Sequence, residues 1–157
     1  MYGSIEQADS YIATHYSPKS AVRKRWESLS DDEKTVFLTN AFEAIEALPF
    51  RGRKAAPEQT AAFPRLPYQY GKTDEGAPQR VKSAETELAL WLSDENKRES
   101  SEKRSQLIAD GVKSFSIGDL SESYGEPQKG SQTFSAQSCT KAMELLTPYL
   151  SGGYDIC

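Results

Sequence analysis

The 157-residue chain contains one histidine, two cysteines and no long hydrophobic run. With one histidine, His15, the common zinc geometries cannot be assembled, and a Ser-His-Asp triad would lack its usual Gly-x-Ser-x-Gly elbow. Cys139 and Cys157 form no Cys-x-x-Cys pair, so we expect a buried reduced thiol and a free terminal thiol. No apolar stretch approaches the ~18–20 residues that cross a bilayer, and the first residues do not resemble a signal peptide. We therefore expect no membrane partner and a cytoplasmic location when the protein is made.

Glycine motifs that cradle phosphate are also missing. The chain has neither a Gly-x-x-x-x-Gly-Lys-Ser/Thr loop nor a Gly-x-Gly-x-x-Gly fingerprint. Its adjacent acids, Asp31, Asp32 and Glu33, suit the start of a helix, whereas acid–base carboxylates face one another across a cleft. We expect no enzyme activity, no catalytic residue, no metal and no cofactor.

Acidic residues outnumber basic ones, 23 to 19, which gives a formal net charge of −4. A protein whose whole surface grips phosphates is usually basic. Any contact with nucleic acid must therefore be local, weak or steric. The length fits one domain, and we expect that domain over residues 1–150, followed by a short tail over 151–157.

Two capping boxes indicate where helices begin. Ser4 with Gln7, and Ser30 with Glu33, have the spacing at which the cap hydroxyl and the later side chain exchange hydrogen bonds with backbone amides. The first box opens a helix over residues 5 to about 16. Apolar residues recur at helical spacing after both boxes, and we expect the helix after Ser30 to be the central core helix.

Prolines indicate further helix starts and ends. Pro18 and Pro78 suit the first position of a second and a fourth helix, and a last helix is expected from about Ser135 to near Pro148. The charged stretch 94–104 is expected to be a solvated helix end or loop.

The hydrophobic period changes in residues 112–124, which predict a β-hairpin around Gly118-Asp119. With a two-residue loop, Ile117 lies opposite Leu120 and Phe115 lies opposite Glu122. The predicted fold is therefore mainly α, a small bundle of about four to five helices with one β-hairpin and a long proline-rich loop.

That loop covers residues 49–77 and contains four of the eight prolines. Because proline removes a backbone donor and a structureless segment of this length is unusual, such a loop tends to be functional or disordered. Aromatic and basic side chains are interleaved here and just after it, as in single-strand binders: Phe50, Phe63, Tyr68, Tyr70, Arg51, Arg53, Lys54, Arg65, Lys72, Arg80 and Lys82. The alternative, which we weight more, is that the rings anchor the loop and the cations face solvent.

Short segments in a consistent order resemble a family of head-tail connector (adaptor) proteins of tailed bacteriophages, some of which carry the label of DnaT-like single-strand-DNA-binding protein. The resembling segments span nearly the whole chain: Tyr2-Gly3-Ser4, Ala8 to Tyr11, Trp26 to Lys34, Ala41 to Leu48, Arg51-Gly52, Phe63-Pro64-Arg65, Pro78 to Lys82, Glu87 to Ala89, Val112 to Leu120, and Leu145 to Leu150. Phe63 stands where the family has Trp, and residues 94–104 have no clear counterpart.

The resemblance implies a structural subunit of the phage neck. Such subunits form a homo-oligomeric ring, usually of twelve copies, below the portal protein, and they extend the channel for passing double-stranded DNA toward the next neck or tail protein. The expected location is then the virion at the head-tail junction, after the host cytoplasm. The alternative function is a single-stranded-DNA-binding module that uses the basic-aromatic loop 50–82.

Two segments without a cap, a helical period or a core stripe are predicted to contact partners: the 49–77 loop and the end of the chain from residue 149. The predicted partner interface consists of Phe50, Arg51, Arg53, Phe63, Arg65, Tyr68, Tyr149, Leu150, Tyr154 and Ile156. The predicted DNA contacts of the alternative function are Arg51, Arg53, Lys54 and Lys72.

Overall fold

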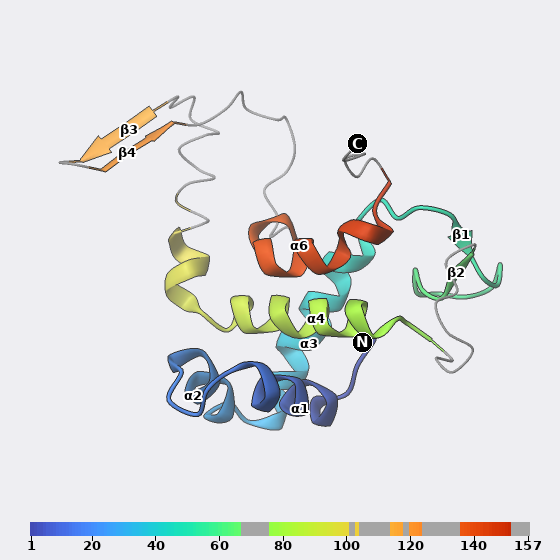
Figure 1. The fold of residues 1–157 in the computed structure, drawn as a ribbon, viewed down its shortest axis with the longest axis horizontal. Coiled ribbons are helices and arrows are strands. Elements are labelled where there is room, and N and C mark those ends of the chain that lie inside the picture. Colours follow the sequence, from blue (N-terminus) through green and yellow to red (C-terminus); the bar gives the residue numbers. More distant parts are fainter. Residues whose placement is uncertain (67–75, 101–102, 104–113, 118–119, 124–135, 152–157) are drawn as a thin grey trace.

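The computed structural model describes residues 1–66, 76–100, 103, 114–117, 120–123 and 136–151. It is mainly helical, as predicted (Figure 1). The helices are α1 (Ile5–His15), α2 (Ala21–Glu27), α3 (Asp31–Glu46), α4 (Gln79–Leu92) and α6 (Thr140–Leu146), with short 3-10 turns η1 (Ala136–Ser138) and η2 (Thr147–Tyr149). No helix in these described stretches is both long and apolar enough to span a membrane.

The two predicted capping boxes are confirmed. The Ser4 hydroxyl accepts from the amide of Gln7 while the Gln7 side chain accepts from the amide of Ser4, and Ser30 and Glu33 do the same at α3. Both boxes satisfy amides that have no partner within the helix. The expected start of the second helix at Pro18 is wrong, because α2 begins at Ala21 with Ser20 as its cap.

The central helix is α4, not α3 as predicted. In Figure 1 it runs between α1 and α6, and α3 crosses it. Ten of its residues are buried, including two glutamates: Val81, Ser83, Ala84, Glu85, Thr86, Glu87, Leu88, Ala89, Leu90 and Leu92. Because most of the surface of α4 is buried, each of its polar side chains in the core needs a hydrogen-bond partner there.

Polar contacts join α1, α2 and α3 on the side away from α6. The indole of Trp26 is 1% exposed and donates to Asp9 at 2.7 Å. The Lys34 ammonium, on α3, lies 3.2 Å from the same carboxylate. One acid on α1 therefore satisfies a buried donor from each of the next two helices.

Two pairs of short strands complete the fold. Strands β3 (Ser114–Ile117) and β4 (Leu120–Ser123) pair antiparallel with Ile117 opposite Leu120 and Phe115 opposite Glu122, the register that was predicted. The 49–77 loop contains a second pair, β1 (Arg53–Lys54) with β2 (Arg65–Leu66), which the sequence did not indicate.

Candidate nucleic-acid interface

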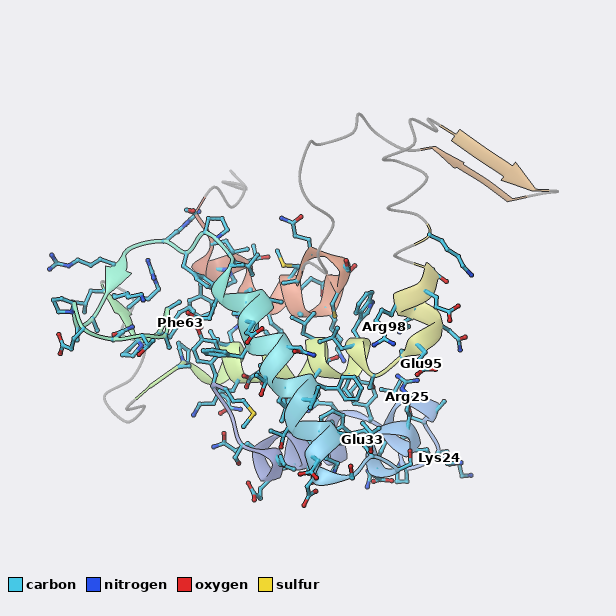
Figure 2. The ribbon with its side chains drawn as sticks, turned by 180° about the vertical axis from the view of Figure 1, so that it is seen from behind. Lys24, Arg25, Glu33, Phe63, Glu95 and Arg98 are labelled. Atoms are coloured by element: carbon cyan, nitrogen blue, oxygen red, sulfur yellow. The ribbon has the colours of Figure 1, made fainter. Side chains whose placement is uncertain are left out.

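The aromatic side chains of the 50–66 loop pack against the helical body. Phe63 is 4% exposed, and its ring centroid lies 4.8 Å from that of Phe50, 5.5 Å from Tyr149 and 5.9 Å from Tyr2, each pair edge-on. Such pairs contribute roughly 0.5–1.5 kcal/mol each beyond their buried area. Figure 2 shows Phe63 where the loop meets the helices. Phe63 and Tyr149, predicted to contact a partner, are thus core residues of their own chain.

The guanidinium of Arg65 forms its hydrogen bonds within the loop. It donates to the carbonyl oxygens of Phe50, Arg51, Gly52 and Ala62 at 2.7 to 3.3 Å. Gly52 has a φ of 72°, a left-handed conformation that glycine adopts without steric cost. Arg65 was predicted to contact a partner. Its side chain instead has a structural role, because it closes the turn at Gly52.

The described part of the loop carries three other basic residues. Lys54 and Arg53 are exposed, and Arg51 is half-buried. The Lys54 ammonium donates to the carbonyls of Gln59 and Thr60 at 3.1 and 2.8 Å, which leaves its third proton directed elsewhere. We call Arg51, Arg53 and Lys54 the basic rim. Among the described residues of the predicted interfaces, Arg53 and Lys54 are the exposed ones.

Residues 149–151 contact the start of the loop. The Arg51 amide donates to the Tyr149 carbonyl, and the Ser151 amide donates to the Pro49 carbonyl, both at 2.8 Å. Phe50 and Leu150 form an antiparallel bridge between these segments. The two predicted interface segments therefore contact each other. Tyr68, Tyr70 and Lys72 of the loop, and Tyr154 and Ile156 of the tail, lie outside the described residues.

Two further cations lie at the start of α4. Arg80 is exposed and Lys82 is half-buried. Lys82 adjoins Gly3, whose neighbour Tyr2 touches Phe63. The first turn of α4 and the 50–66 loop therefore both contact the N-terminal residues.

His15 occupies a different part of the surface. It is exposed, stacks on Tyr11 with ring centroids 4.0 Å apart, and its Nδ1 lies 2.8 Å from the Tyr11 carbonyl oxygen. A shallow depression beside α1 includes both residues together with Glu6 and Gln79. Within the described residues, no group of three or more His, Cys, Asp and Glu side chains could hold a metal ion. Cys139 is free and buried.

Sequence reasoning missed two carboxylates that position the loop. Glu46 accepts the Ala62 amide at 2.9 Å and the Tyr2 hydroxyl, and Glu85 is fully buried under the amides of Tyr2 and Gly3. Burial raises the pKa of Glu85 to about 7, against the lowering effect of the Gly3 amide. No local sequence pattern marks either acid, because their partners are distant in sequence.

Comparison with known protein families gives a match over nearly the whole chain. The family described as "Putative DnaT-like ssDNA binding protein" matches residues 2–156. The chain belongs to this DnaT-like family. Searches of curated proteins and of solved structures gave no match. The family match spans the N-terminal residues, the basic rim and all the described helices, and it confirms the DnaT-like label that the resemblance carried.

Proposed function

We propose that the chain binds single-stranded DNA, with the basic rim contacting phosphates. The observation that carries the proposal is the family match, which covers nearly the whole chain and whose description names that ligand. Arg53 and Lys54 present accessible cations on a hairpin that is anchored from below by Phe63 and Arg65. An anchored hairpin loses little freedom when it binds, which lowers the entropic cost of association.

The geometry favours binding through phosphates over base stacking on Phe50 and Phe63. Stacking requires an open ring face, whereas Phe63 is 4% exposed and Phe50 packs edge-on against it. Contacts to phosphates alone carry no sequence information and weaken as salt rises. The expected ligand is therefore single-stranded DNA of any sequence, bound in the micromolar range.

The proposal is tested by fluorescence anisotropy with a labelled oligothymidylate at physiological salt. The double variant Arg53→Ala/Lys54→Ala is expected to bind about tenfold more weakly, because two phosphate contacts are lost. A matched control is Lys19→Ala/Lys24→Ala, which removes two exposed cations near and on α2, distant from the hairpin in Figure 1. Equal loss in both variants would reject the basic rim as the binding surface, since it would reflect net charge alone.

A second candidate is a structural subunit of a tailed-phage neck. The observation that favours it is the ordered set of segments, from Tyr2-Gly3-Ser4 to Leu145–Leu150, that resemble head-tail connectors. In this role the chain would form a ring between the portal and the next neck or tail protein, in the virion. Native mass spectrometry, alone and with a portal protein, would then give a defined multiple of 17.4 kDa. A monomer under both conditions would count against it.

A further inference from the structure

The N-terminal residues are held against the helical body by one buried acid. The amides of Tyr2 and Gly3 each donate at 2.8 Å to a different oxygen of Glu85, whose residue is 0% exposed. Both oxygens of this buried side chain therefore have a donor from the N-terminal residues. Residues 2–4, which we call the strap, are thereby fixed to α4.

The same strap contacts the 50–66 loop through the Tyr2 side chain. Its hydroxyl donates to Glu46 on α3, and the Glu46 carboxylate also accepts the Ala62 amide of the loop. The Tyr2 ring lies 4.9 Å from Phe42 and 5.9 Å from Phe63, both edge-on. Tyr2 is therefore in contact with α3 and with the loop at once, while its amide is held by α4.

Gly3 permits the close approach of the strap to α4. A Cβ at this position would lie 3.3 Å from Gln7 Oε1 and 3.4 Å from Glu85 Oε2. The contact with Gln7 is tight and would require that side chain to shift by a few tenths of an ångström, whereas the distance to Glu85 is an ordinary contact. Gln7 Oε1 accepts the Ser4 amide in the capping box of α1. Gly3 of the strap therefore lies beside the start of the first helix.

We propose that the strap is a conformational device that sets the position of the 50–66 loop: seated on Glu85, it holds the loop through Tyr2, and its release loosens the loop that carries the basic rim. The mechanical coupling stands on the contacts alone. Its consequence for DNA rests on the proposed function, because the loop carries Arg53 and Lys54.

Limited trypsin digestion of the folded full-length chain tests the coupling, since Arg51, Arg53 and Lys54 are cleavage sites inside the loop. Tyr2→Phe removes the bond to Glu46. Glu85→Gln leaves one of the two amides facing an NH₂ donor in place of an acceptor. Each is expected to speed cleavage in the loop about fivefold, as expected for one hydrogen bond lost from a local opening equilibrium.

Tyr11→Phe is the matched control, because it also removes one tyrosine–glutamate hydrogen bond, here to Glu87 on α4 at 2.7 Å, away from the loop. It is expected to leave cleavage in the loop unchanged. Unchanged cleavage in both strap variants, or an equal increase in the control, would overturn the proposal.

The anisotropy assay on the same variants separates this proposal from the proposed function. Faster cleavage with altered oligothymidylate affinity supports both. Faster cleavage with unaltered affinity supports the strap and contradicts binding through the loop. Unaltered cleavage with altered affinity contradicts the strap and leaves binding to be explained by the Tyr2 region itself.

Discussion

Lys141 on α6 lies 2.7 Å from the carboxylate of Glu87 on α4. The Glu87 side chain is 3% exposed and also accepts the hydroxyls of Tyr11 and Tyr16, at 2.7 and 2.6 Å. Tyr16 is in turn the acceptor of a second Lys141 proton, at 2.9 Å. One buried acid therefore joins α1, α4 and α6, and each of its two oxygens has at least one donor.

Replacement of this cation tests the contribution of the pair to stability. Lys141→Met is expected to lower the free energy of unfolding by roughly 2 kcal/mol, because the Glu87 charge stays buried without its counterion. This expected loss is smaller than for a fully buried ion pair, because the Lys141 side chain is 51% exposed. Urea denaturation followed by circular dichroism measures it. The double variant Lys141→Met/Glu87→Gln is expected to recover part of the loss, and no recovery would contradict the assigned cause.

Stability is expected to depend on pH through Glu85. Because burial raises its pKa from 4.5 to about 7, the folded chain holds this proton more tightly than the unfolded chain does. The unfolded chain binds fewer protons between these values, so stability falls as pH rises through that window, by up to about 3 kcal/mol. The N-terminal ammonium and Lys82 oppose this shift.

The measurement is the free energy of unfolding at pH 5 and pH 8 for the natural chain and for Glu85→Gln. The variant lacks the titrating group, so its decline over this range should be smaller by that amount. Parallel declines in the two proteins would show that Glu85 is ionised in both states.

Local sequence signals predicted local structure well. The capping boxes at Ser4 and Ser30 depend on residues three positions apart, and the register of β3 with β4 follows from a two-residue loop. In each case the interacting groups are close in sequence. The pattern therefore contained the whole interaction.

Long-range polar contacts could not be predicted in this way. The donors of Glu85 and Glu87 include Tyr2, Tyr11 and Lys141, at sequence separations that no helical period reports. The capping box and apolar spacing of α3 predict a core helix, but they contain no sign that α4 is buried on more of its surface. The structural role of Arg65 could not be predicted either. Its acceptors are backbone carbonyls, which every residue has, so no sequence pattern marks them.

Phe63→Leu separates anchoring from stacking. As a core substitution in an aromatic cluster, it is expected to lower the free energy of unfolding by roughly 1–3 kcal/mol. The affinity of the folded variant for oligothymidylate should change by less than about twofold, since the ring does not touch DNA. Thermal unfolding and anisotropy, both measured at a temperature where the variant is folded, give the two values. Lost affinity with unchanged stability would mean that Phe63 leaves the core to stack on a base.

The most direct test of binding through the basic rim is the salt dependence of affinity for the natural chain. With two to three phosphate contacts, log K against log salt concentration should have a slope between about −1.4 and −2.1, and oligothymidylate and oligoadenylate should bind alike. A slope near zero, a strong base preference, or no binding at low salt would contradict the account.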